Sequence, residues 1–466
     1  MTTPITVQGN LATVTYQDFV ARKALVTQNY GFAVSDSDVH PVLFDHQRAL
    51  TRWAVRKGRC AVFADTGLGK TPIQVEWCRL VGGRSLIIAP LSVARQTAAM
   101  ARDMLGVYVH YTRSGSDLIN GINITNYEML QHFSADAFDA VALDESSILK
   151  AIDGKTRRRL TEMFRDTPFR TCYSATPAPN DRSELGRHAE FLGVMTEADM
   201  LATFFVHDDD GWRLKGHAQD AFYRWLASWG MSVRKPSDIG YSDEGYNLPP
   251  LTTTPLWLDN DHATPGALFF MGLHGIQDRT AARRAALDTR IERVAELVNA
   301  NAEQWVVWHG LNPEGHELAR LIPDAVLVEG SQKPEEKVTA FEAFQDGRYR
   351  VLITKPRIGG YGLNLQNASR TVFCGLSDSW EDYYQCIRRL YRFGQARPVE
   401  VYAVLSRAEA EIWENVQRKE TEAREMADRL IEHVRAFERE ELDDVTEADT
   451  YRPAVDMRLP NWLQVA

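Results

Sequence analysis

The chain has 466 residues, a formal net charge of −10 and 25% charged residues, and 44% of its residues are hydrophobic. This composition is that of an ordinary globular protein, and the length predicts two or three domains. No apolar run reaches the roughly 18 residues of a membrane span, and the N-terminus lacks a secretory signal pattern. We therefore expect a cytoplasmic protein without a membrane partner. The negative charge excludes a uniformly basic nucleic-acid surface but not a local basic groove.

Short apolar runs alternate with amphipathic helical patterns from residue 40 onward, which predicts a parallel α/β sheet. Strands are expected at residues 60–64, 85–89, 122–125, 140–143 and 170–173. Helices are expected at residues 71–80, 92–104 and 155–164. We interpret residues 1–39 as an N-terminal extension and residues 40–203 as a first lobe.

A second alternating series at residues 288–408 predicts a second lobe. Its strands are expected at residues 304–308, 351–354, 371–374 and 399–405, and its helices at 290–299, 334–344 and 380–392. Residues 204–287 are rich in aromatic residues, glycine and proline, and we interpret them as an interlobe connector. Residues 409–466 are predicted to form a charged brace helix with one apolar stripe, followed by a polar tail.

The most informative motif is C-A-V-F-A-D-T-G-L-G-K-T at residues 60–71, a strand followed by a glycine turn and the start of a helix. Backbone N–H groups of such a turn bind phosphate, and Lys70 adds a positive charge. Thr71 is placed to put its hydroxyl on a magnesium ion. Ala64 stands where the consensus has glycine. The alternative is a chance glycine-rich turn, but the flanking strand and helix favour a phosphate-binding loop.

Two acidic residues follow the strand predicted at 140–143. Asp144 can hold the magnesium ion that bridges the phosphates, and Glu145 can orient and deprotonate an attacking water. A solvated turn is the alternative, which the upstream Lys70 disfavours. Ser174 and Thr176 follow the next strand, where a helix cap explains them as well as a functional role does.

The second lobe carries a glycine-rich loop at residues 359–365, which suits close backbone approach, and a basic segment at 385–395. Arg389 and Arg392 are three residues apart, so they share one face of a helix. Two guanidinium groups on one face suit the capture of phosphate oxygens and of charge that develops during phosphoryl transfer. A solvated basic surface is the alternative for this segment alone.

In this order the motifs resemble those of the superfamily-2 helicases and translocases, and most closely the Snf-type DNA translocases, over residues 41–405. Arg234 with the L-P-P segment at 248–250, and the R-F-G-Q at 392–395, favour the Snf type. The resemblance implies two tandem RecA-like lobes with ATP and Mg²⁺ in the cleft between them. It implies catalytic roles for Lys70, Glu145, Arg389 and Arg392, and metal binding by Thr71 and Asp144.

The resemblance also implies further contacts. Nucleotide binding is expected at Gln47, Thr66, Gly67, Gly69, Lys70, Thr71, Gly362 and Gln385. Contacts with DNA are expected at Pro90, Ser92, Thr125, Asn126, Tyr127, Lys355 and Gly359. Coupling of hydrolysis to movement is expected at Ser174 and Thr176. Two residues depart from the family pattern: Ser147 replaces a histidine, and Arg388 replaces the glycine before Arg389.

We therefore expect an ATP-dependent motor that moves along duplex DNA as a monomer, with branched or single-stranded DNA as alternative partners. The chain leaves no room for large insertions or histone-reading modules, so we expect a compact phage or bacterial enzyme of DNA replication, recombination or repair. One alternative is a helicase that separates strands of DNA or RNA. An alternative of another class is a non-catalytic DNA-binding scaffold.

Overall fold

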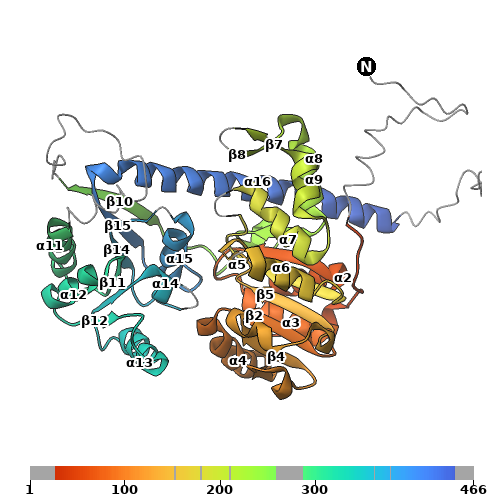
Figure 1. The fold of residues 1–466 in the computed structure, drawn as a ribbon, viewed down its shortest axis with the longest axis horizontal. Helices are drawn as coiled ribbons and strands as arrows, with labels where there is room; N and C mark the ends of the chain where they lie inside the picture. Colours follow the sequence, from red (N-terminus) through yellow and green to blue (C-terminus); the bar gives the residue numbers. More distant parts are fainter. Residues whose placement is uncertain are drawn as a thin grey trace, which may run out of the picture.

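The computed structural model describes residues 27–151, 154–178, 181–208, 211–258, 287–360, 363–377 and 379–446. They form two α/β lobes with one long helix, α16 (Ala410–Thr446), lying across both (Figure 1). The predicted α/β class, with a parallel sheet in each of two RecA-like lobes, is confirmed.

The first lobe is built on a seven-stranded sheet in the order β3-β4-β2-β5-β6-β1-β9. All of its neighbouring strands pair in parallel. The strands are β1 (Arg59–Ala64), β2 (Ser85–Ala89), β3 (Val109–Tyr111), β4 (Ile122–Asn126), β5 (Ala140–Asp144), β6 (Phe169–Tyr173) and β9 (Gly230–Val233). Its helices are α2 (Asp45–Lys57), α3 (Lys70–Val81), α4 (Leu91–Leu105), α5 (Ile148–Ala151), α6 (Gly154–Met163), α7 (Leu185–Leu192), α8 (Glu197–Phe204) and α9 (Gln219–Ala227).

The second lobe is built on a six-stranded parallel sheet in the order β10-β15-β14-β11-β13-β12. The strands are β10 (Leu251–Leu258), β11 (Trp305–His309), β12 (Ala325–Val328), β13 (Val351–Thr354), β14 (Arg370–Cys374) and β15 (Val399–Ser406). Its helices are α11 (Leu287–Asn299), α12 (Asn312–Leu321), α13 (Pro334–Gln345), α14 (Pro356–Gly359) and α15 (Trp380–Leu390).

The central strands read as apolar runs because helices cover both faces of each sheet. Every residue of β2, β4, β5, β11 and β13 is buried. This burial explains why the runs in the sequence predicted these strands well.

The structure corrects the interlobe connector expected at residues 204–287. Residues 230–233 form the edge strand β9 of the first sheet, and residues 251–258 form β10, which pairs with β15 along its length. Strands β7 (Phe205–Asp208) and β8 (Gly211–Leu214) form an antiparallel hairpin on the first lobe. Most of the described part of this segment therefore belongs to the lobes, and residues 259–286 lie outside the described residues.

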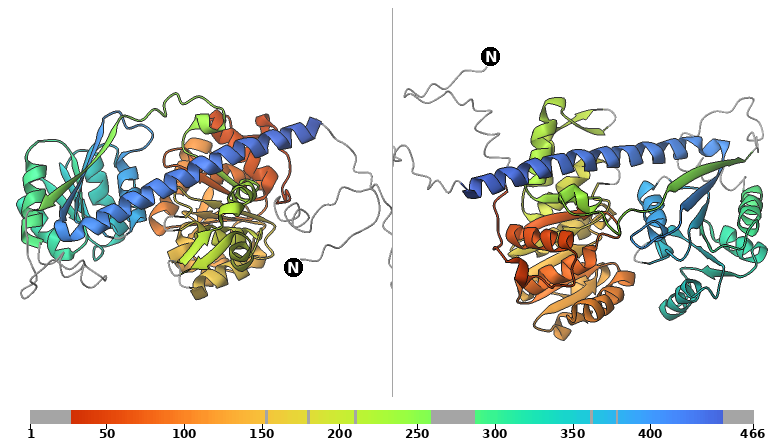
Figure 2. Two further views of the ribbon diagram at one scale, coloured as in Figure 1. Left: turned by 90° about the horizontal axis from the view of Figure 1, so that it is seen from above. Right: turned by 180° about the vertical axis from the view of Figure 1, so that it is seen from behind.

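Helix α16 ties the two lobes together through its apolar stripe. Ile412 and Val416 pack into the core of the second lobe, whereas Met426, Leu430 and Val434 pack into the core of the first. Figure 2 shows the helix running along both lobes in two further views. The tail expected after it, residues 447–466, and the first 26 residues of the N-terminal extension lie outside the described residues.

Candidate nucleotide site

The candidate site lies where three neighbouring strands of the first sheet end. Strands β5, β6 and β1 are adjacent, and parallel strands place their carboxyl ends at one edge of a sheet. The loops that carry Lys70, Asp144 and Ser174 follow these three strands, so the fold brings the predicted residues of the first lobe together.

The loop between β1 and α3 has the backbone expected of a phosphate-binding turn. Gly67 and Gly69 have φ angles of 95° and 84°, a left-handed region that favours glycine. A Cβ atom on Gly69 would lie 2.2 Å from Gln47 Nε2, and one on Gly67 would lie 2.8 Å from the backbone nitrogen of Phe393. Both positions therefore require glycine for space as well as for conformation.

Lys70 begins α3, and its Nζ donates hydrogen bonds to the carbonyl oxygens of Ala64 at 2.8 Å and Asp65 at 3.3 Å. Burial lowers the pKa of Lys70, and the carboxylates of Glu145, Asp65 and Asp144 oppose that shift. The ammonium group of Lys70 therefore lies near these three carboxylates.

Gln47, on α2, is hydrogen-bonded to the same loop. Its Nε2 donates to the carbonyl oxygen of Leu68 at 3.2 Å, and its Oε1 accepts from the backbone N–H of Phe44 at 3.1 Å. The amide of Gln47 thus connects the start of α2 to the phosphate loop.

The two acidic residues lie at the end of β5 in different local settings. Burial and the neighbouring charge of Glu145 raise the pKa of Asp144 to about 6, despite the charge of Lys70. Burial also raises the pKa of Glu145, and Lys70 is the main opposing charge. Glu145 has a φ of 51°, which lies in the left-handed region where residues other than glycine are strained.

The second lobe presents its arginines from α15 and the turn after it. The Arg389 side chain donates to Gln385 Oε1 at 2.6 Å and to the carbonyl oxygen of Leu363 at 3.4 Å. Arg392 donates to the same carbonyl oxygen at 3.4 Å, and burial followed by the charge of Arg389 lowers its pKa to about 10. The charge of Arg389 shifts the pKa values of Lys70, Asp144 and Glu145, so the arginine faces the first-lobe site.

The residues predicted to contact DNA differ in how far they are buried. The side chains of Thr125, Asn126 and Tyr127 are buried, and the Tyr127 hydroxyl donates to the carbonyl oxygen of Asp144 at 2.8 Å. DNA contacts at these three positions stay predictions, which concern the backbone rather than these buried side chains. Lys355 is half-buried at the end of β13.

Four further residues, three expected to contact DNA and Gly362 expected to contact the nucleotide, are placed as follows. Pro90 is half-buried after β2, and Gly359 is buried in α14. The side chain of Ser92 and the whole of Gly362 lie outside the described residues.

The sequence analysis missed several residues that complete the site. Asp65 accepts hydrogen bonds from Tyr384 and Arg388 across the lobe boundary, and Phe393 covers Gly67. The signal available in the sequence was the departure from the family pattern at Arg388, the residue directly before the predicted catalytic Arg389.

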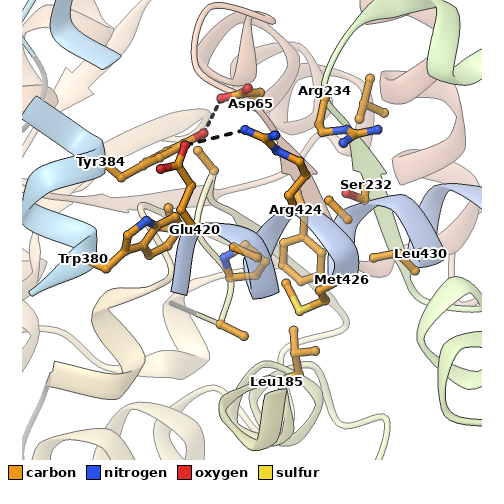
Figure 3. Close-up of a pocket in the computed structure, with 18 of the residues that line it drawn as sticks. Asp65, Leu185, Ser232, Arg234, Trp380, Tyr384, Glu420, Arg424, Met426 and Leu430 are labelled. Atoms are coloured by element: carbon orange, nitrogen blue, oxygen red, sulfur yellow. Dashed lines mark hydrogen bonds and ion pairs between the residues drawn. The ribbon is translucent and has the colours of Figure 1, made fainter. Parts of the chain in front are cut away.

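A cavity of about 140 Å³ lies beside these interlobe contacts, between α16 and the two lobes (Figure 3). Asp65, Arg234 and Tyr384 line it together with Met426 and Leu430 of α16.

The donor set fits a magnesium ion held together with phosphate. Mg²⁺ takes oxygen ligands and is usually bound through one or two carboxylates plus substrate phosphates. Asp144 supplies a carboxylate and Thr71 a hydroxyl near the phosphate loop. Among the described residues, no three His, Cys, Asp or Glu side chains gather as a separate metal site. No helix in the described part of the chain is long and apolar enough to cross a bilayer.

Comparisons with known proteins agree with this site. A family model described as the helicase conserved C-terminal domain matches residues 315–394, which include α15 and the arginines. The chain is 30% identical over 155 residues to Helicase swr1 of Aspergillus fumigatus, covering 33% of this chain and 8% of that protein. It is 27% identical over 135 residues to Transcriptional regulator ATRX of Homo sapiens, covering 28% and 5%. The chain thus spans less than a tenth of the length of these relatives.

Among solved structures, the fold is similar to that of the Sulfolobus solfataricus SWI2/SNF2 ATPase core, which was solved in complex with dsDNA. The similarity covers 80% of this chain and 90% of that chain, with 16% sequence identity and a TM-score of 0.42.

The family match and the named relatives show that this chain is similar to helicases. More specifically, they confirm its resemblance to the superfamily-2 helicases and translocases of the Snf type. The cytoplasmic location and the phage or bacterial role stay predictions.

Proposed function

We propose that this chain is a DNA-dependent ATPase that moves along duplex DNA. The observation that supports it most directly is the arrangement around Glu145. Ser174 of the first lobe donates to Glu145 Oε1 at 3.3 Å, and two residues further on Thr176 donates to Glu381 of the second lobe at 3.3 Å. Both lobes therefore meet beside Glu145, where the charges of Lys70 and Arg389 both lower its pKa. A cleft of this kind suits transfer of a phosphoryl group, where charge must be stabilised from both sides.

Each residue has a distinct task in this proposal. Lys70 and the backbone N–H groups of the loop bind phosphate oxygens. Glu145 orients the attacking water and accepts its proton, while Arg389 and Arg392 stabilise the charge that develops on the transferred group. Thr71 and Asp144 would hold Mg²⁺, which when bound neutralises phosphate charge.

Movement would follow from opening and closing of the cleft. Hydrolysis removes the group that both lobes hold, so the lobes can separate and close again around the next nucleotide. If each lobe grips the phosphate backbone, alternate closure advances the protein with little dependence on sequence. The resemblance to Snf-type translocases supports duplex DNA as the track.

The test is the rate of ATP hydrolysis with no nucleic acid, single-stranded DNA, duplex DNA or duplex RNA. We expect the strongest stimulation by duplex DNA and none in the Lys70→Ala variant. Stronger stimulation by RNA would favour the RNA helicase alternative. DNA binding without turnover under any of these conditions would favour the scaffold.

A further inference from the structure

One side of α15 is docked on the first lobe. Glu381, Tyr384 and Arg388 are spaced by three and four residues, so they lie on the same side of the helix. Thr176 Oγ1 donates to Glu381 Oε1 at 3.3 Å, which connects this side to the segment after β6.

The other two residues contact Asp65, the first residue after β1. The Tyr384 hydroxyl donates to Asp65 Oδ1 at 2.6 Å, and Arg388 Nη2 donates to Asp65 Oδ2 at 2.7 Å. Figure 3 shows Tyr384 pointing toward Asp65. Both oxygens of this one carboxylate are therefore held by the second lobe.

Asp65 is also part of the phosphate loop. The same Oδ1 accepts the backbone N–H of Thr66 at 2.6 Å, and the carbonyl oxygen of Asp65 accepts from Lys70 Nζ at 3.3 Å. A change in the position of the Asp65 side chain would therefore also shift the loop that binds phosphate.

The Arg388–Asp65 ion pair is shielded from water. The exposed fractions of the two side chains are 18% and 13%, and the guanidinium lies 5.0 Å and 5.4 Å from the ring centroids of Tyr384 and Tyr391. Burial is the largest single influence on the pKa of Arg388 and would lower it, but the Asp65 carboxylate, Tyr384 and Tyr391 together outweigh burial and the pKa is raised. A shielded ion pair of this kind stabilises the contact between the lobes more than an exposed pair would. Removal of either partner leaves the charge of the other buried without a counter-charge.

The side of α15 that contacts the first lobe is next to the side that carries Arg389. Arg389 follows Arg388 directly and is held to Gln385 of the same helix at 2.6 Å. Because an α-helix moves largely as one body, the contacts of Tyr384 and Arg388 determine how far Arg389 lies from the phosphate loop.

We propose that Arg388 and Tyr384 are positioning residues, which place Arg389 of α15 against the phosphate loop by holding Asp65. This inference rests on the proposed ATPase function. Arg388 does not touch the nucleotide in it. Its loss should therefore leave ATP binding by the first lobe intact and slow the step that needs both lobes.

The main test is a double-mutant cycle with Asp65→Asn, Arg388→Gln and both together, read as kcat and KM for ATP with duplex DNA. We expect Arg388→Gln to lower kcat by about tenfold and to change KM less than about twofold. Asp65→Asn should lower kcat to a similar extent and also raise KM, because its side chain belongs to the phosphate loop. The double variant should resemble Asp65→Asn, because both changes remove the same contact. Arg388→Lys, which keeps the charge, should recover part of kcat.

Arg418→Gln is the matched control. Arg418 pairs with Glu422 along the exposed side of α16, with exposed fractions of 59% and 46%, so its loss should change neither constant. Tyr384→Phe removes only one hydroxyl and tests the same contact if the Arg388 variants fold poorly. Additive losses in the double variant, or an unchanged kcat in Arg388→Gln, would overturn the proposal.

A second measurement separates this inference from the proposed function. All five native cysteines are buried, so dyes can be attached to cysteines introduced at Tyr108 and Val338, which are 67% and 51% exposed on the two lobes. Energy transfer between the dyes should fall in Arg388→Gln, because the lobes separate more often. Absence of ATPase activity in the parent would reject the proposed function. Energy transfer in Arg388→Gln equal to that of the parent would reject the interlobe contact, whatever the ATPase activity.

Discussion

Ser174 and Glu145 are joined by a hydrogen bond in which the serine hydroxyl donates to Glu145 Oε1 at 3.3 Å. Ser147 donates to the same oxygen at 3.2 Å. The two hydroxyls thus hold the carboxylate of a residue whose backbone is strained, and strain of this kind persists only where the surroundings enforce it. Although Ser147 departs from the family pattern, it keeps a hydrogen-bond donor beside the predicted base.

Glu145→Gln should retain ATP binding and lose most of its turnover. The amide can still accept from the two serines, and Asp144 can still hold the metal, but the attacking water loses its base. The measurement is a comparison of nucleotide affinity with steady-state hydrolysis. Lys70→Ala is the contrasting variant and should weaken nucleotide binding as well. Turnover of Glu145→Gln at the parent rate would show that the role assigned to Glu145 is wrong.

Arg392→Ala should lower kcat by a factor on the order of 10³, as for other arginine fingers. Its guanidinium is held at the carbonyl oxygen of Leu363, within the second lobe, so nucleotide binding to the first lobe should survive. Single-turnover hydrolysis with duplex DNA, measured beside nucleotide affinity, checks this. A normal rate in this variant would contradict a site shared between the lobes.

Much of the fold could be predicted from the sequence because its central strands are buried on both faces. Residues 351–354 were predicted as a strand with the bounds that the structure shows for β13. The edge strands were harder to predict. Strand β9 lies in a glycine- and aromatic-rich segment, and β10 has several exposed threonines and a proline, so neither shows a long apolar run.

The site could be predicted where a motif follows a strand directly, as Lys70 and Asp144 do. Tertiary packing determined the rest. The sequence could not reveal that Tyr127 turns inward to the carbonyl oxygen of Asp144, or that Arg388 reaches Asp65. Asp65 and Arg388 are 323 positions apart, so no local pattern reports their contact.

The first lobe should lose stability as the pH falls from about 6.5 to about 4, in part through His188. Burial lowers the pKa of His188 to about 4. An unfolded histidine titrates near pH 6.5, so between these values the unfolded chain binds more protons than the folded one, and the free energy of unfolding decreases by up to about 3 kcal/mol. The contribution of His188 is constant above this window.

His188→Gln should remove this part of the pH dependence, since glutamine does not titrate and can accept the hydrogen bond that joins Ser146 and His188. Denaturant unfolding at pH 5 and pH 7 measures the effect. His316→Gln is the control, because His316 is 62% exposed and only pairs with Glu329. The same loss of stability on acidification in the parent and in His188→Gln would argue against the assignment.

DNA affinity should fall steeply with salt despite the net charge of −10. Each phosphate neutralised on duplex DNA contributes about −0.9 to the slope of log affinity against log salt concentration. Lys355→Ala should make the slope less steep by about one unit, whereas Lys337→Ala, which removes an ammonium group held at the carbonyl oxygen of Gly330, should leave it unchanged. An affinity that is the same at low and physiological salt would contradict a groove that follows phosphates.

The protein should move on duplex DNA without efficient strand separation. Separation needs a wedge, usually an apolar element that unstacks the terminal base pair at a cost of a few kcal/mol per step. In the second lobe the pair Asp346-Gly347 is the end of α13, with a φ of 76° at Gly347, and does not form a hairpin. The hairpin of β7 and β8 belongs to the first lobe, and its Asp208 is paired with Arg213.

The assay for this prediction is displacement of a triplex-forming third strand from duplex DNA. It should require ATP, fail in Lys70→Ala and survive in Trp212→Ala, which truncates the exposed aromatic residue of the hairpin. A moving body that follows the duplex backbone removes the third strand without opening the pairs beneath it, so the same preparation should release little strand from a forked duplex. Rapid ATP-driven release from the fork, with no triplex displacement, would show that the chain is a strand-separating helicase.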